Sequence, residues 1–191
     1  MRRATQALLV FVVFSLLCGL VYPLCMTAVS QLLFPWRANG SLLSSQKQIV
    51  GSELIGQMFK GPQYFHGRPA ATDPVYNASG STGSNFGPSN AKFLQEVKNR
   101  IEAVRLANGV SSDTPIPADL VLASASGLDP HISVEAAMLQ VKRIAKERGL
   151  SESELTGIVR RNIEGRFGGI WGQPRVNVLK LNLALDAGKK E

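Results

Sequence analysis

Cysteine and histidine are both scarce in this chain of 191 residues. The two cysteines, Cys18 and Cys25, lie in one apolar run, and the two histidines, His66 and His131, are far apart in the sequence. A disulfide framework needs several paired cysteines, and a zinc site needs three or four nitrogen, sulfur or carboxylate ligands. We therefore expect neither a disulfide framework nor a metal centre beyond the apolar run.

Motifs for hydrolysis and for phosphate binding are also missing. Ser124 and Ser126 lack the G-x-S-x-G elbow that presents a hydrolase nucleophile. Residues 80–87 are rich in glycine, but no Gly-Lys-Ser/Thr follows and the spacing is not G-x-G-x-x-G, so a structural turn is favoured over a phosphate loop. The Asp-Pro-His sequence at 129–131 is expected to form a turn before a helix capped by Ser133.

Charge is absent between Arg3 and Arg37. Residues 7–34 form an uncharged, mostly apolar run, and roughly 20 helical residues suffice to cross a hydrocarbon core about 30 Å thick. The alternative is a cleaved signal peptide, but its apolar part is usually about 7–15 residues long, shorter than this run, and no clean pair of small residues marks a cleavage site here. An uncleaved transmembrane helix, kinked or interrupted at Pro23, is therefore favoured.

The orientation of this helix is predicted from its flanking residues. Arg2 and Arg3 crowd one end, whereas Phe34, Trp36 and Arg37 lie at the other boundary as an interfacial belt. Because positive charge is retained in the cytoplasm, we expect the N-terminus inside and the rest of the chain outside the cytoplasm. The expected organisation is a short cytoplasmic N-terminus (1–6), a transmembrane helix (7–34) in contact with lipid, and one extracytoplasmic domain (35–191).

The excess of positive charge does not indicate a nucleic-acid partner. The chain has a net charge of +7, of which Arg2 and Arg3 supply two, so about +5 is left for the expected outer domain. Nucleic-acid binding requires clustered basic residues with aromatic side chains between them or a known fold signature. Neither is found here, and we predict no nucleic-acid partner.

The outer part is predicted to be an α/β or α+β domain of about three helices and a small sheet. Short strands are expected within 41–59, around 42–43 and 49–50 and then around 54–55 and 58–59. The apolar periodicity and the capping residues predict the helices. They are expected from Asn90 to Gly109, from Ser133 to Gly149, and from a capping box formed by Ser151 and Glu154 onward.

A further strand is expected near the C-terminus. Leu179, Leu181, Leu183 and Leu185 alternate with polar or small residues, as in a strand that is buried on one face.

Residues 61–90 are predicted to form a long ordered loop. Gly, Pro, Ser and Asn occupy 16 of these 30 positions, which is typical of a linker. The aromatic side chains of Tyr64, Phe65, Tyr76 and Phe86 favour attachment to the domain, because so much apolar area is poorly tolerated in water. Arg68 in this loop is a candidate to pair with a partner's carboxylate, the alternative being an exposed arginine stacked on aromatic surface.

Four blocks of sequence lie in a recognisable order at 51–57, 67–90, 119–133 and 174–186. Together with the N-terminal span, they resemble the C subunit of the bacterial Kdp potassium-transporting P-type ATPase. Ala70, Phe86 and Leu122 depart from the family's usual residues.

The resemblance implies a non-catalytic accessory subunit of a high-affinity potassium uptake complex in the bacterial inner membrane, with its outer domain in the periplasm. Its partners would be a pore-forming, potassium-binding subunit and an ATP-hydrolysing subunit, and it would assemble the complex and act as a catalytic chaperone that raises ATP affinity. ATP is the implied nucleotide and would be bound on the pump subunit, since this chain lacks the Asp-Lys-Thr-Gly phosphorylation motif. The candidate partner-contact residues are Arg68, Tyr76, Ser84, Asn85, Phe86, Ser126, Asp129 and His131.

An outward-facing domain cannot touch cytoplasmic ATP, so an effect on ATP affinity would have to pass through the conformational equilibrium of the pump. Two other functions are open from the sequence. One is a stand-alone, membrane-anchored binding module of the cell envelope. The other is an anchored hydrolase, which the absence of a nucleophile elbow and of metal ligands disfavours.

Overall fold

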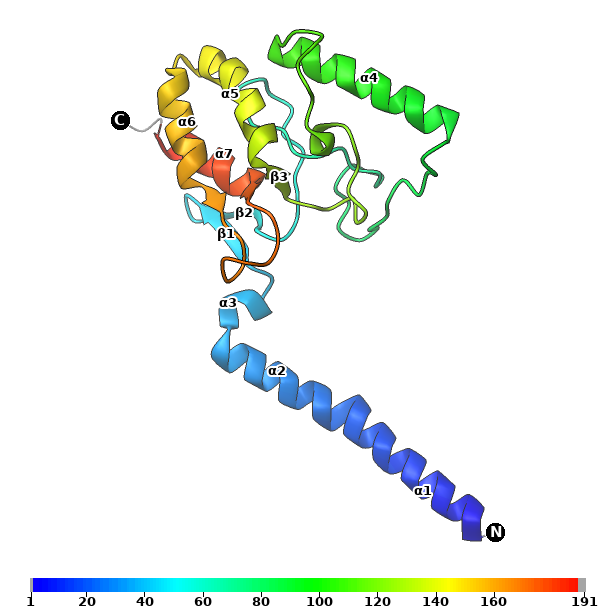
Figure 1. Cartoon of the computed structure of the whole chain (residues 1–191). Coiled ribbons are helices and arrows are strands. Elements are labelled where there is room, and N and C mark those ends of the chain that lie inside the picture. The colour runs from blue at the N-terminus through cyan, green and yellow to red at the C-terminus, as the bar shows by residue number, and fades with distance from the viewer. Residues whose placement is uncertain (1, 189–191) are drawn as a thin grey trace. The chain divides into compact units, whose positions relative to one another are not determined.

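The computed structural model describes residues 2–188 of the chain. These residues form two compact units that meet between Leu42 and Leu43, and each is described separately (Figure 1). The first unit consists mainly of apolar helix. The second contains the remaining helices and strands together with the hydrophobic core.

The first unit is built on one long apolar helix. Helix α1 (Arg2–Leu16) continues through a π-helical turn (Leu17–Val21) into α2 (Tyr22–Leu33). Together they give a helix of 32 residues, long and apolar enough to cross a membrane. It is the one helix of this length and composition among the described residues, and it includes nearly all of the expected span at 7–34. A short helix, α3 (Pro35–Ala38), follows.

The π-helical turn is the local response to Pro23. Proline lacks an N–H group, and its ring collides with the carbonyl four residues earlier, which here belongs to Gly19. The helix widens just before the proline, so that the Tyr22 N–H bonds to the Leu17 carbonyl. The expected interruption at Pro23 is thus a widened turn, with helix on both sides.

The second unit begins with a two-stranded sheet of β1 (Leu42–Ser45) and β2 (Gln48–Ser52). These are two of the expected short strands. The stretches around 54–55 and 58–59 form turns and irregular structure, so the expectation of strands there was wrong. Both stretches are short and interrupted by glycine, which leaves too few residues for a paired strand.

Three helices lie where their caps predict them. In α4 (Ala91–Asn108) Asn90 accepts a hydrogen bond from the Phe93 N–H, and in α5 (Val134–Arg148) Ser133 accepts from Ala136. Helix α6 (Glu152–Arg161) begins with the expected reciprocal capping box. Both α4 and α5 end at a glycine with positive φ.

A three-stranded antiparallel sheet supports these helices. Its strands β3 (His131–Ser133), β5 (Arg175–Asn177) and β4 (Ile163–Glu164) lie in that order, and Val176 in the middle pairs with Ile132 and Ile163. The expected turn at 129–131 is present in part. Asp129 Oδ1 accepts a hydrogen bond from the His131 N–H at 3.0 Å, but His131 already belongs to β3.

The strand expected around 179–185 was wrong, because Val178–Ala187 form helix α7. Asn177 caps this helix by accepting a hydrogen bond from the Lys180 N–H. The buried residues Val178, Leu181, Asn182 and Leu185 have the i, i+3, i+4, i+7 spacing of a helix face. Alternating leucines suggested a strand only because the buried Asn182 was read as a solvent-facing polar residue.

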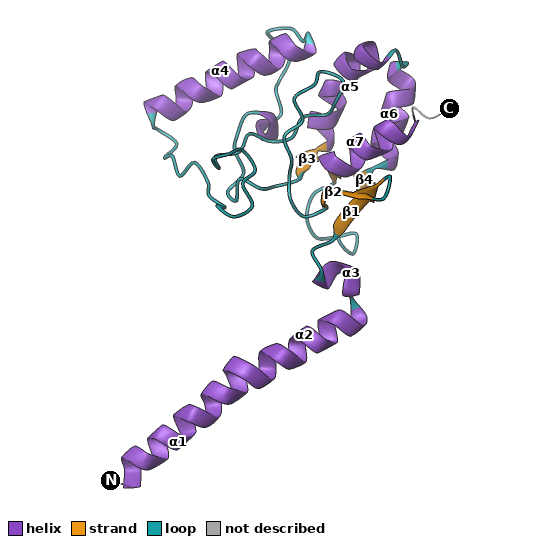
Figure 2. Ribbon diagram, turned by 180° about the vertical axis from the view of Figure 1, so that it is seen from behind, coloured by secondary structure: helices purple, strands orange, loops and turns teal. Residues whose placement is uncertain are grey.

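The core lies between α5, α6, α7 and the three-stranded sheet, which Figure 2 shows grouped together at one side of the unit. Phe65 enters it from the long loop and is completely buried. The larger buried side chains around it are Ile132, Val141, Ile144, Leu155, Val159, Val176, Leu181 and Leu185.

Candidate interaction site

The long loop at 61–90 is fastened to the core by two buried amide side chains. Asn182 of α7 accepts from the Phe65 N–H at 2.9 Å and donates to the Phe65 carbonyl at 3.0 Å. Gln140 of α5 accepts from the His66 N–H at 2.8 Å and donates to the His66 carbonyl at 3.1 Å. Each side-chain amide therefore satisfies both backbone groups of one loop residue, as a neighbouring strand would do in a sheet. Both amide side chains belong to residues that are about 1% exposed.

Two arginines of α5 complete the attachment. Arg143 donates to the carbonyls of Pro62 and Tyr64 and to the Asn108 side chain of α4. Arg148 donates to the Gln63 carbonyl at 2.8 Å and lies 5.0 Å from the ring centroid of Tyr64. The prediction of an ordered loop attached to the domain is thus confirmed.

The sequence analysis missed the residues that hold this loop. Gln140 and Arg143 were not singled out, and Asn182 was placed on the polar side of an expected strand, although each of the three lies on the inner side of a helix. A signal was available, because a polar residue at a core-facing helix position implies a buried partner that needs its hydrogen bonds.

Further along the loop, Arg68 pairs with a carboxylate of this same chain. Its Nη1 lies 3.0 Å from Asp129 Oδ2, and the Tyr76 hydroxyl donates to the Arg68 carbonyl at 2.7 Å. Both side chains of the ion pair are partly exposed, at 25% for Arg68 and 30% for Asp129. The loop and the segment before β3 therefore meet at a charged surface.

The Arg68–Asp129 pair is one end of a longer chain of charges. The His131 ring lies between two carboxylates, with Nδ1 3.4 Å from Asp129 Oδ1 and Nε2 3.4 Å from Glu164 Oε2. Glu164 also pairs with two cations, Arg175 and Lys180. We call this network, which Lys180 extends to Glu53, the charged cluster; it consists of Arg68, Asp129, His131, Glu164, Arg175, Lys180 and Glu53.

The charged cluster fixes the protonation of two candidate residues. Partial burial alone would raise the pKa of Asp129, but hydrogen bonds from His131 and the charge of Arg68 prevail and lower this pKa to about 2. Burial, and secondarily the charge of Asp129, raise the pKa of Tyr76 to about 12 against the opposing effect of Arg68. At neutral pH the carboxylate is therefore charged and the phenol remains a hydrogen-bond donor.

The structure brings together four of the eight sequence-predicted contact residues. Arg68, Tyr76, Asp129 and His131 belong to or touch the charged cluster. Ser126 lies nearby in the chain, where its Oγ accepts from the Leu128 N–H and its carbonyl accepts from the 81–82 segment.

The other three predicted residues, Ser84, Asn85 and Phe86, lie near the start of α4. Phe86 packs on Phe93 with ring centroids 5.8 Å apart, whereas Ser84 and Asn85 are exposed. Gly83 has a packing role, because a Cβ at this position would come within 2.8 Å of the Ala125 carbonyl oxygen. This close approach gives the stretch a structural role, but residues 81–87 are irregular and contain no turn, so the expectation of a turn there was wrong.

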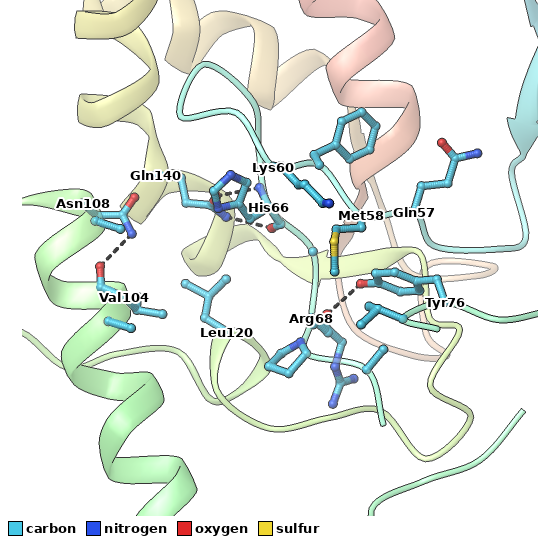
Figure 3. Close-up of a pocket in the computed structure, with 17 residues that line it drawn as sticks. Gln57, Met58, Lys60, His66, Arg68, Tyr76, Val104, Asn108, Leu120 and Gln140 are labelled. Atoms are coloured by element: carbon cyan, nitrogen blue, oxygen red, sulfur yellow. Dashed lines mark hydrogen bonds between the residues drawn. The ribbon is translucent and has the colours of Figure 1, made fainter. Parts of the chain in front are cut away.

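A cleft of about 570 Å³ opens between the loop and α4 (Figure 3). Its walls come from Met58, Val75 and Tyr76 of the loop side and from Val104 of α4, with the Gln140–His66 hydrogen bonds at one end. Burial lowers the pKa of His66, and Arg143 acts in the same direction against the hydrogen bond with the Gly61 carbonyl, so the ring is neutral near pH 7.

The cleft is lined mainly by apolar side chains, with Lys60, His66 and Gln140 among the polar ones. The lining residues that the structure describes include no carboxylate. Within residues 2–188 there is also no group of three or more His, Cys, Asp and Glu side chains that could hold a metal ion. The arrangement thus offers an apolar cleft, a charged surface and a rigid loop between them.

Comparison with known proteins gives consistent matches over nearly the whole chain. Residues 4–187 match the protein family described as K+-transporting ATPase, c chain. A relative from Methylococcus capsulatus, named Potassium-transporting ATPase KdpC subunit, is 53% identical over 182 residues and covers 95% of each chain. Relatives of the same name are 54% identical in Burkholderia ambifaria (94% of this chain, 93% of the relative) and 53% in Caldanaerobacter subterraneus (91% and 89%).

Proposed function

Because the chain belongs to the C-chain family of the K+-transporting ATPase, we propose that it is a non-catalytic accessory subunit that assembles the complex and raises the ATP affinity of the pump subunit. The similarity that runs from residue 4 to residue 187 carries this proposal. The proposed partners are a pore-forming, potassium-binding subunit and an ATP-hydrolysing subunit. ATP itself would bind to the latter.

The proposed orientation has the N-terminus in the cytoplasm and the second unit in the periplasm. The support is the pair Arg2 and Arg3 before the apolar helix, with Trp36 after it. Protease added to spheroplasts should then remove the part beyond residue 42, and protease added to inverted vesicles should leave it intact. The reverse pattern would refute the orientation and would permit direct contact with cytoplasmic ATP.

From this orientation follows a proposal for how ATP affinity rises. A domain on the outer side can change nucleotide affinity only by binding one conformation of the pump more tightly than another. Such coupling is reciprocal, so ATP should also tighten the association of this chain with the complex. A coupling of 1–3 kcal/mol corresponds to a change of roughly 5- to 150-fold in the apparent Kd for ATP.

The test compares the pump complex purified with and without this chain. We expect weaker ATP binding without the chain and restoration when the full chain is added back. We also expect no ATP binding by the full chain alone in detergent. Stoichiometric ATP binding by the chain alone would contradict transmission through the pump and would favour a shared nucleotide site.

The partner contacts are best tested away from residues that hold the fold. Arg68 and Tyr76 are bonded within the domain, so their substitution would change both stability and surface. Ser84 and Asn85 are exposed near the start of α4 and suit the experiment better. If this surface is an interface, Ser84→Arg should lower the yield of purified complex while the melting temperature of the chain is unchanged.

A second candidate function rests on the cleft beside Tyr76. An apolar cleft of about 570 Å³ is of a size that holds a small ligand, as a stand-alone binding module of the envelope would require. The two functions differ in what co-purifies. A detergent extract that yields two large hydrophobic partners with this chain supports the pump subunit, and a lone chain that retains a small apolar molecule supports the binding module.

A further inference from the structure

The connection between β4 and β5 presents the most exposed group of large apolar side chains in the second unit, as far as the structure describes it. We call residues 165–174 the tip loop. Phe167, Ile170 and Trp171 are exposed by 84%, 73% and 72% of their surface. Single exposed apolar residues are common, but three within five positions are typical of a surface that meets another apolar phase.

The tip loop is ordered despite this exposure. Phe167 and Trp171 exchange both backbone hydrogen bonds, at 2.8 and 3.0 Å, and so close a small hairpin. Gly168 and Gly169 provide the positive φ angles of 60° and 78° that the turn between them requires. Because the backbone is held in this way, the three apolar side chains are fixed outside the core and are available for contact without reordering.

The charged cluster holds both ends of the tip loop. Glu164 at the end of β4 lies 3.2 Å from Arg175 at the start of β5, and its other oxygen lies 3.3 Å from Lys180. Lys180 in turn pairs with Glu53, whose carbonyl accepts from the Asn177 side chain at 2.8 Å. The base of the tip loop is therefore attached to the residue that directly follows β2.

This attachment places the tip loop at the end where the chain enters the second unit. Both views place the β4–β5 connection at the same end of this unit as β1 and β2 (Figures 1 and 2). Only residues 34–41 separate the apolar helix from β1. Eight residues reach at most about 29 Å when extended, which limits how far the start of β1 can lie from the end of the apolar helix.

The charge around the tip loop matches an anionic surface. Arg166 lies in the loop, Arg161 ends α6 just before it, and Arg175 follows it with a side chain that is 56% exposed. Residues 165–185 contain no acidic residue. An apolar centre with aromatic side chains and surrounding arginines is the pattern of segments that bind the interfacial region of anionic bilayers.

We infer that the tip loop inserts Phe167, Ile170 and Trp171 into the interfacial region of the bilayer, with arginines on anionic lipid phosphates. The inference goes beyond the proposed function and is independent of it. It also holds for either orientation of the apolar helix. Its physical role is to give the second unit a second attachment to the membrane surface besides the helix.

The experiment uses the fluorescence of Trp171 in the full chain carrying Trp36→Phe. The chain is reconstituted into vesicles of phosphatidylcholine and phosphatidylglycerol, some with bromine on the upper part of the acyl chains. We expect emission shifted to shorter wavelength, loss of intensity with brominated lipid, and low sensitivity to iodide in the water. These effects should diminish in vesicles without phosphatidylglycerol and in Arg166→Gln.

The matched control moves the tryptophan to another exposed position. Leu106→Trp, with Trp36 and Trp171 both replaced by Phe, places the indole on α4 at a site that is 87% exposed and far from the tip loop in sequence. This control should be quenched by iodide and insensitive to brominated lipid. Equal melting temperatures for the variants would show that the fold is intact.

Two results would overturn the inference. In the first, Trp171 behaves like the control, with emission typical of water and no quenching by brominated lipid. In the second, Trp171 is protected from iodide only after other membrane subunits of the complex are added, and brominated lipid still has no effect. The tip loop would then be a docking element for a protein.

Discussion

The attachment of the long loop to the core can be tested with one substitution, Asn182→Leu. Leucine has the same number and branching of heavy atoms as asparagine but a larger volume, so the change removes the hydrogen bonds and opens no cavity, with some crowding of the core. The Phe65 N–H and carbonyl, now bonded to Asn182 at 2.9 and 3.0 Å, would stay buried without partners. A buried group left in this state costs about 1–3 kcal/mol.

The expected loss of stability follows from these contacts. Two unsatisfied groups amount to about 2–6 kcal/mol, and the apolar leucine side chain offsets about 1–2 kcal/mol of this through burial. A net loss of about 3 kcal/mol should lower the Tm by roughly 6–12 °C for a unit of this size. Near-ultraviolet circular dichroism of the full chain in detergent follows the tertiary structure and is little affected by the apolar helix.

The control is Asn99→Leu on the exposed face of α4, where the side chain accepts a hydrogen bond only from Gln95. Its free energy of unfolding should change by less than about 0.5 kcal/mol. Hydrogen exchange should show faster exchange at Phe65 and His66 in Asn182→Leu alone. If both variants unfold at the temperature of the parent chain and the loop amides stay protected, the buried amides do not hold the loop.

Three further predictions concern the charged cluster, the core and a helix cap. The pKa of Asp129 is about 2, against 3.8 unperturbed, so the charged carboxylate stabilises the fold above pH 5. The difference in unfolding free energy between the parent and Asp129→Asn should therefore shrink by up to about 2 kcal/mol as the pH falls from about 5 to 2. A difference that stays constant with pH would refute this prediction. Leu181→Ala should cost about 2–5 kcal/mol in urea unfolding, because this side chain is completely buried, and exposed Leu106→Ala should cost almost nothing. Ser133→Ala removes the α5 cap and a bond to Asp119 and should cost about 1–2 kcal/mol by the same assay, unlike exposed Ser153→Ala.

The helices were the part of the fold that the sequence predicted best, because their signals are local. An N-cap such as Ser133 or Asn90 and a C-terminal glycine such as Gly149 act within one turn and need no knowledge of the rest of the chain. The apolar helix was predicted for a similar reason, since its length and lack of charge are properties of composition alone.

Helix α7 was missed because its pattern is ambiguous without tertiary context. Leu179, Leu181, Leu183 and Leu185 fit a period of two, and only the burial of Asn182 reveals the helical face. That burial depends on Phe65, which lies 117 positions earlier in the chain. The contact between Asn182 and Phe65 forms only when the chain folds, and the sequence around Asn182 does not indicate it.

The candidate site was predicted only in part, because some of its contacts also join segments that are far apart in the chain. Arg68, Tyr76, Asp129 and His131 were chosen as surface residues, and the structure brings them together. Glu164, which joins the tip loop to this network, was missed because ion pairs between distant segments leave no periodic signal. The tip loop could have been noticed from the sequence, because it has three large apolar residues among glycines. Such a group is unusual on a surface.

The long loop is held by two kinds of interaction that respond differently to conditions. Its first part, around Phe65 and His66, is fixed by neutral amides that are fully buried, so neither salt nor moderate pH should loosen it. Its next part, at Arg68, is held by an ion pair that is partly exposed and therefore contributes little stability, usually about 0–1 kcal/mol. A partner that binds the charged cluster can thus break the Arg68–Asp129 pair at small cost, while the buried amides keep the loop in place and confine the change to the surface.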